Sequence, residues 1–202
     1  MNRALLNILS VLLLAILCSV WMSCGSEPLV LKGNPVKTYK SDLVTFTAIF
    51  LDELTLKKRY GGKNNPFISV QRAITPRTFI VFDLIIKAEK EKLNLQLNKM
   101  ELEYAAIRVS PKSRFHLRDY WSLEDDLNES LKPKDTEKKV ILINKTVFPD
   151  RFAVSPESTV KGLIVFSGNF PKSGTATLSI PFFDGAGNLL DVAELDYQYS
   201  LY

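Results

Sequence analysis

Apolar and polar residues alternate along much of the chain, which is typical of strands that are buried on one face only. In KLNLQLN, residues 92–98, leucines at odd positions oppose Asn and Gln at even positions. In KMELEY, residues 99–104, the apolar residues stand at even positions instead. This change of phase predicts a bulge or a tight turn near Asn98 and Lys99. Residues 193–201 alternate in the same way and predict the last strand.

A second group of segments is apolar at nearly every position and predicts strands that are buried on both faces, or nearly so. These segments are residues 43–51, 78–86, 139–144, 162–168 and 175–183. DGAGN, residues 184–188, separates two such strands and predicts a hairpin loop. Helical periodicity is scarce, and residues 118–131 are the segment that favours a short helix, with Tyr120, Leu123 and Leu127 on one side. Strands of this length with turn signals between them predict an all-β, antiparallel sandwich of two sheets.

The first residues follow a different pattern. Arg3 precedes the run 4–22, which holds no charged residue. A short basic segment followed by an apolar segment is typical of a secretory signal. The run is also about 20 residues long, which is enough to span a bilayer as a helix. A disulfide between Cys18 and Cys24 is not expected, because their spacing in a helix separates the Cα atoms by about 9 Å, beyond the roughly 7 Å limit for a bridge.

The end of the apolar run indicates how the chain is anchored. Cys24 follows the small residue Ser23, and Gly and Ser follow it. This arrangement resembles the lipobox of bacterial lipoproteins, in which type II signal peptidase cuts before a cysteine that carries diacylglycerol, although Trp21 and Met22 depart from the usual residues. The resemblance implies a signal peptide over 1–23 and membrane lipid attached at Cys24.

The alternatives to lipidation are a cleaved signal without lipid and an uncleaved anchor, and all three place the body outside the cytoplasm. In a lipoprotein, residues 25 and 26 decide between the two membranes of a cell that has two. They include no Asp, the residue that retains lipoproteins at the inner membrane of enteric bacteria. We therefore expect a cell-envelope protein, at the outer membrane where there are two.

Composition supports a globular body after this leader. The chain of 202 residues is 46% hydrophobic, and its 26 basic and 22 acidic residues give a net charge of +4. So mild a charge is no argument for nucleic-acid binding. Residues 24–36 hold two prolines and two glycines, including Gly25, and predict a tether. Residues 37–202 are long enough for one domain with its own core.

Three segments of this body resemble a known kind of protein. They are YGGKNNPFI at 60–68, FIVFDLII at 79–86 and VSPESTVKGLIVFSGNFPKSGTATLSIPFFD at 154–184. Together they look like small bacterial lipoproteins with an immunoglobulin-like β-sandwich. The resemblance implies an all-β, immunoglobulin-like sandwich and brings no catalytic signature, so it bears on fold more than on function.

Motifs for catalysis are weak. His116 is the single histidine, and no G-x-S-x-G elbow accompanies it, which argues against a catalytic triad. A single histidine also argues against a zinc site. We expect His116 to be an ordinary loop or strand residue. Ser158 and Lys161 match the S-x-x-K motif of penicillin-binding proteins, but no S-D-N element separates them from the K-[ST]-G match at 172–174. We therefore expect no enzyme and no cofactor.

Two patches combine basic and aromatic residues. The first is predicted to lie in a loop and holds Lys57, Lys58, Arg59, Tyr60 and Lys63. The second is the candidate site for a protein partner and holds Arg114, Phe115, Arg118, Tyr120 and Trp121. Arg, Tyr and Trp are the residues that most often supply binding energy at interfaces. The alternative for the second patch is that its aromatic side chains cover one end of the sandwich.

The sequence thus predicts an exported, lipid-anchored, non-enzymatic β-sandwich that binds a protein or envelope component, or supports envelope structure. The alternative is a periplasmic or surface hydrolase whose site is assembled from scattered carboxylates. A pocket that holds carboxylates of raised pKa would favour the enzyme. A flat aromatic patch on an exposed sheet would favour the binding protein.

Overall fold

We analysed a computed structural model of the chain, which describes residues 29–62, 64–68, 78–127, 133–168 and 173–201. The predicted signal peptide, Cys18 and Cys24 lie outside the described residues, and so does Lys63 of the first basic patch. Their predicted roles remain predictions.

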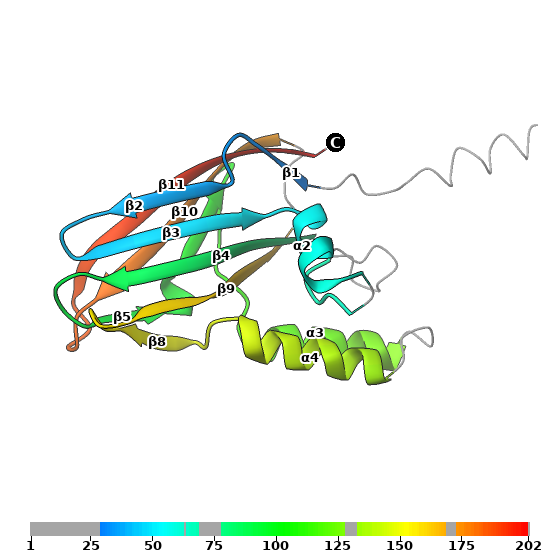
Figure 1. Cartoon of the computed structure of the whole chain (residues 1–202). Coiled ribbons are helices and arrows are strands. Elements are labelled where there is room, and N and C mark those ends of the chain that lie inside the picture. Colours follow the sequence, from blue (N-terminus) through cyan, green and yellow to red (C-terminus); the bar gives the residue numbers. More distant parts are fainter. Residues whose placement is uncertain (1–28, 63, 69–77, 128–132, 169–172, 202) are drawn as a thin grey trace, which may run out of the picture.

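Two antiparallel sheets pack face to face (Figure 1). The four-stranded sheet has the order β2 (Val36–Lys40), β3 (Val44–Leu51), β4 (Thr78–Ala88), β9 (Thr159–Gly168). The seven-stranded sheet runs through β1 (Leu29–Lys32), β11 (Leu189–Leu201), β10 (Ser173–Phe183), β5 (Leu93–Gln96) and β8 (Arg151–Val154). Its other two strands, β6 (Glu101–Tyr104) and β7 (Ile107–Val109), extend from β10. The predicted all-β, antiparallel sandwich is confirmed.

The alternating segments form strands as expected. The change of phase at Asn98 and Lys99 is a short 3₁₀ turn, η1 (Leu97–Lys99), between β5 and β6. The loop 184–188 joins β10 to β11. Residues 175–183 are a strand, but the expected burial of both faces is wrong: Leu178 and Ile180 are fully buried, whereas Thr177 and Ser179 between them are only half-buried.

The main core lies between the two sheets. Its largest side chains are aromatic and come from both sheets, with Phe82 of β4 and Tyr197 of β11 at a ring-centroid distance of 5.1 Å. The Tyr197 hydroxyl donates a hydrogen bond of 3.0 Å to the carbonyl of Ala48 in β3, so the core also holds a polar link between the sheets. Burial raises the pKa of Tyr197, because the phenolate form is poorly solvated there.

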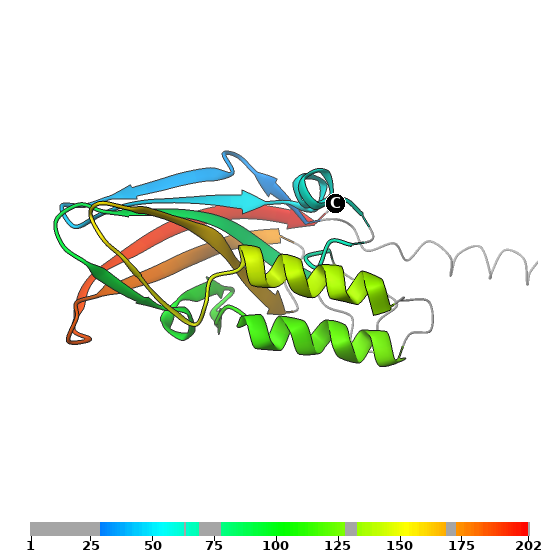
Figure 2. The same cartoon turned by 60° about the horizontal axis from the view of Figure 1, so that its bottom comes forward.

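Three helices cover one end of the outer face of the four-stranded sheet (Figure 2). They are α2 (Glu53–Tyr60), α3 (Arg114–Leu127) and α4 (Pro133–Thr146). Their apolar side chains meet outward residues of β4 and β9, such as Val81 and Val165, in a second core. These two strands are therefore buried on both faces, as their sequences predict.

The helical layer corrects four expectations. The strand expected at 139–144 is wrong, because these residues lie in α4. The helix expected from residue 118 begins at Arg114, so His116 is helical rather than a loop or strand residue. Its backbone N–H donates to the Ser113 hydroxyl at 3.2 Å, which caps the helix. The first basic patch is not a loop, because Lys57, Lys58 and Arg59 form the last turn of α2.

The expected tether 24–36 is also partly wrong. Its residues Leu29–Lys32 form β1, which pairs along the edge of β11 from Leu29 opposite Leu201 to Lys32 opposite Gln198. The chain then crosses to the four-stranded sheet, where β2 begins at Val36. The N-terminal end of β1 and the C-terminal end of β11 lie together at one end of the sandwich (Figure 1).

Candidate functional site

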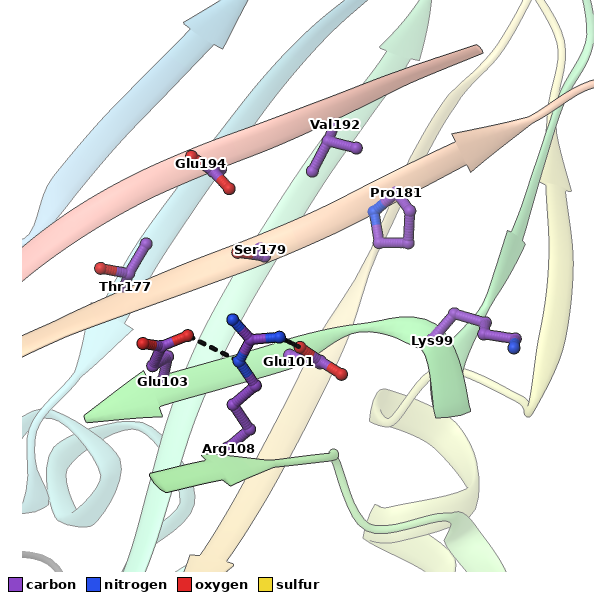
Figure 3. Close-up of a pocket in the computed structure, with 9 residues that line it drawn as sticks. All are labelled: Lys99, Glu101, Glu103, Arg108, Thr177, Ser179, Pro181, Val192 and Glu194. Atoms are coloured by element: carbon purple, nitrogen blue, oxygen red, sulfur yellow. Dashed lines mark hydrogen bonds and ion pairs between the residues drawn. The ribbon is translucent and has the colours of Figure 1, made fainter. Parts of the chain in front are cut away.

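The two sheets differ in what covers their outer faces. The three described helices all pack on the four-stranded sheet, and none of them lies on the outer face of the seven-stranded sheet. That outer face presents the polar phase of β6, β10 and β11 to solvent. It contains a hollow of about 490 Å³ (Figure 3), lined by Lys99, Glu101, Glu103, Arg108, Thr177, Ser179, Pro181, Val192 and Glu194.

One row of side chains crosses four strands of this face. Arg108 of β7 lies opposite Glu103 of β6, which lies opposite Thr177 of β10, which lies opposite Asp196 of β11. The Arg108 Nε donates to Glu103 Oε2 at 2.7 Å, and the Thr177 hydroxyl donates to Asp196 Oδ1 at 2.7 Å. Side chains directly opposite in paired strands are about 5 Å apart at Cβ, which explains both contacts.

A second row lies beside the first. Glu101 of β6 is opposite Ser179 of β10, which is opposite Glu194 of β11. Arg108 reaches this row as well, with its Nη1 at 3.8 Å from Glu101 Oε2. In Figure 3 the guanidinium lies between the two glutamates of β6, on the floor of the hollow.

Four carboxylates and one guanidinium therefore share the face, and we call Glu101, Glu103, Glu194 and Asp196 the acidic band. The hydrogen bond with Glu103, followed by the charges of Glu103 and Glu101, raises the pKa of Arg108. Within the described chain no ion pair engages Glu194 or Asp196. Arg108 thus pairs with the two glutamates of β6, and it forms no ion pair with Glu194 or Asp196 of β11.

The turn that positions Arg108 is strained. Ala105 and Ala106 join β6 to β7 with φ values of 46° and 63°. Residues with a Cβ, other than Asn and Asp, avoid this left-handed backbone conformation, because the Cβ then approaches the following carbonyl oxygen. Strained backbone of this kind concentrates at functional sites. Here it holds Arg108 opposite Glu103.

Among the described residues, the hollow has no histidine in its lining. The only histidine lies on α3, in the helical layer that packs on the other sheet. Among the described residues no group of three or more His, Cys, Asp or Glu side chains is placed to hold a metal ion. Two carboxyl groups elsewhere, Glu89 and Asp184, have lowered pKa values because they accept hydrogen bonds, chiefly from Thr45 and Asn188. This shift is opposite to that of a general acid.

The predicted partner-binding segment is divided between two sides of α3. Phe115 is 63% exposed, and Arg118 is exposed as well. Arg114 is half-buried, and its Nε donates to the carbonyl of Val147 at 2.6 Å, which ties α3 to the end of α4. The five residues therefore do not form one continuous surface.

Tyr120 and Trp121 belong to the second core. They are 5% and 1% exposed. The Trp121 Nε1 donates to the carbonyl of Pro66 at 3.1 Å, and the Lys139 ammonium lies 3.5 Å from the centroid of the Trp121 ring. This placement agrees with the alternative in which the aromatic side chains cover the sandwich.

Two residues of the first basic patch, Arg59 and Tyr60, are engaged internally, whereas Lys57 and Lys58 are exposed. Arg59 at the end of α2 forms an ion pair with Asp83 of β4 and lies over the ring of Tyr60, 5.2 Å from its centroid. This pair fastens α2 to the outer face of the four-stranded sheet.

Comparisons with known proteins add no relative. No model of a protein family matches the chain, and no curated protein is similar to it in sequence. Among the described residues, no helix has the length and apolar character that crossing a membrane requires. Fold and site together define a two-sheet β-sandwich with helices over one end of one face and a second face that is open and polar.

Proposed function

We propose that this chain is a non-enzymatic binding module of the cell envelope, anchored through lipid on Cys24, which contacts a basic segment of an envelope protein through the acidic band. The observation that carries the contact surface is the difference between the two faces. The helices α2, α3 and α4 pack on one end of one sheet, whereas no described helix packs on the other sheet, which leaves a hollow of about 490 Å³ open to solvent.

The chemistry of the hollow favours a cationic group in the partner. Glu194 and Ser179 lie side by side and supply oxygens, and Arg108 already occupies the position between Glu101 and Glu103. A lysine or arginine from a partner fits the half of the band that Arg108 does not reach. Charge complementarity of this kind sets specificity and speeds association more than it raises affinity. Moderate affinity with strong salt dependence is the expected result.

Photo-crosslinking in cells tests the surface. A photoreactive amino acid replaces Ser179 in the open face, and in the matched control it replaces the exposed Lys138 of α4. We expect one envelope protein to crosslink at position 179 and not at 138. Equal yields of the same adduct at both positions would contradict the proposal.

Charge reversal tests the chemistry with a defined probe. Glu194→Lys should weaken binding of an oligolysine peptide about tenfold or more at low salt, since like-charge juxtaposition costs several kcal/mol. Glu137→Lys on α4 makes the same charge change at an exposed position away from the band. An equal loss in both variants would indicate only the net charge of the chain.

The anchor is tested separately. Cys24→Ala should abolish incorporation of a fatty-acid probe and processing of the leader, whereas Cys18→Ala should change neither. Labelling of Cys24→Ala at the level of the unmodified chain would refute the lipoprotein assignment, and it would leave the contact surface to be decided by crosslinking.

A further inference from the structure

A second hollow lies where the chain passes from one sheet to the other. It measures about 430 Å³ and is lined by Lys32, Gly33, Asn34, Lys37, Thr175, Asp196, Tyr197 and Gln198. Lys32 ends β1 and Lys37 lies in β2, so the two lysines approach from the two sheets. Gly33, with φ of 102°, makes the bend between them possible.

The side chains around this hollow are mostly hydrogen-bond donors. Lys32 lies opposite Gln198, and Gln198 lies opposite Thr175, so an ammonium, an amide and a hydroxyl form one row across three strands. Within the described residues no ion pair engages Lys32 or Lys37. The carboxylate in the hollow, Asp196, accepts the hydroxyl of Thr177.

The position of the hollow relates it to the membrane. Gln198 and Thr175 lie near the end of the sandwich where β1 enters. The loops 41–43, 89–92 and 184–188 lie at the opposite end, because Val44 pairs with Ala88 and Phe183 pairs with Leu189. Lys32 stands eight positions after Cys24 in the sequence. A chain that is attached before residue 29 thus directs this end of the sandwich toward the lipid surface, with the two lysines in that half of the molecule.

We propose that this hollow binds the phosphate group of an anionic phospholipid of the membrane that carries the chain. The inference rests on the membrane attachment in the proposed function. It does not require that the attachment is lipid on Cys24, since an uncleaved anchor places the hollow in the same way. Two ammonium groups with amide and hydroxyl donors suit a phosphate, which offers only acceptors and negative charge. Each lysine near an anionic surface strengthens association roughly fivefold.

Protection of the lysines from acetylation tests this directly. The full chain, purified from membranes, is placed in nanodiscs of phosphatidylcholine with or without phosphatidylglycerol, and mass spectrometry follows the acetylation of each amine. Lys92 and Lys161 are exposed and lie toward the opposite end of the sandwich, so they serve as internal controls. We expect phosphatidylglycerol to slow acetylation of Lys32 and Lys37 roughly fivefold, and to leave the controls unchanged. Millimolar inorganic phosphate in plain phosphatidylcholine discs is the second arm.

Each outcome decides between the explanations. Equal acetylation in both nanodiscs, or slowing at all four lysines alike, would overturn the proposal. Full protection by inorganic phosphate alone would assign the hollow to free phosphate and overturn the lipid source. A Lys32→Gln chain should lose the protection of Lys37, whereas Lys92→Gln should keep it. Failure of the fatty-acid labelling at Cys24 would not alter these results, so the two proposals fail independently.

Discussion

Replacement of Trp121 distinguishes a structural role of α3 from a role in recognition. Trp121 is 1% exposed in the second core, between α3, α4 and the loop after α2. Truncation of a buried tryptophan to alanine costs about 3–5 kcal/mol from lost burial and the cavity that remains. It also leaves the carbonyl of Pro66 without its donor and uncovers Lys139, which is only 3% exposed. We expect Trp121→Ala to lower the free energy of unfolding by about 4 kcal/mol, a large part of the 5–15 kcal/mol of a typical domain.

Urea unfolding of the exported chain, followed by circular dichroism, measures this loss. Tryptophan fluorescence cannot follow unfolding of this variant, because Trp121 is the only tryptophan that follows the predicted leader, and the other, Trp21, lies within the leader. The matched control is Phe115→Ala, an aromatic residue of the same helix that is 63% exposed. Its unfolding free energy should change by about 0.5 kcal/mol or less, as at surface positions generally.

Two results would refute the reasoning. A Trp121→Ala chain within about 1 kcal/mol of the unmodified chain, at an unchanged denaturant slope, would show that the second core does not depend on this side chain. Loss of partner capture by a variant of normal stability would instead restore the recognition role that the sequence suggested for residues 114–121.

Two further predictions concern the backbone. Replacing Ala105-Ala106 by Asn-Gly should raise the free energy of unfolding by about 1 kcal/mol, since Asn and Gly accept positive φ in two-residue hairpin turns. Thermal unfolding measures the gain in stability. No gain would show that the Ala-Ala turn is unstrained. Gly162→Ala should destabilise by about 1–3 kcal/mol through overpacking, because the new Cβ would lie 3.0 Å from the Phe148 ring, which would have to shift against Phe152, on which it stacks at 4.1 Å. A double-mutant cycle with Phe148→Leu checks the cause, and an unchanged Gly162→Ala cost in that background would exclude the ring contact.

The strands of the sandwich could be predicted from the sequence because each contains its own evidence. Alternation over four to nine residues shows which side chains share a face, and it located the break at Asn98 and Lys99. The helix α4 could not be recognised in the same way. Its apolar run 140–143 is as short as a strand and holds β-branched residues, so it reads as β when taken alone. The helical signal lies in the wider spacing of Thr136, Lys139, Ile143 and Val147, all buried on one side.

The sequence predicts the orientation of the acidic band's residues but not the strand pairing that brings them together. Alternation predicts that Glu194 and Asp196 face away from the core, and the same holds for Glu101 and Glu103. It does not predict that β6 pairs with β10, because these strands are about 70 residues apart and no local rule fixes such a partner. The β6–β7 hairpin was also hidden, since its turn is Ala-Ala instead of the usual Asn-Gly.

The two outer faces differ in helix coverage because the outward-facing positions of their strands hold different kinds of residue. At one end of β4 and β9 the outward positions are apolar, such as Val81 and Val165, so that part of the face is stable only when helices cover it. On β10 the outward positions are Thr177 and Ser179, which remain hydrated without a cover. The seven-stranded sheet is therefore the broader open polar surface among the described residues. Because β1 holds the N-terminal end of the sandwich at the proposed membrane, that open face would stand roughly perpendicular to the lipid surface, accessible to a neighbouring protein of the same envelope.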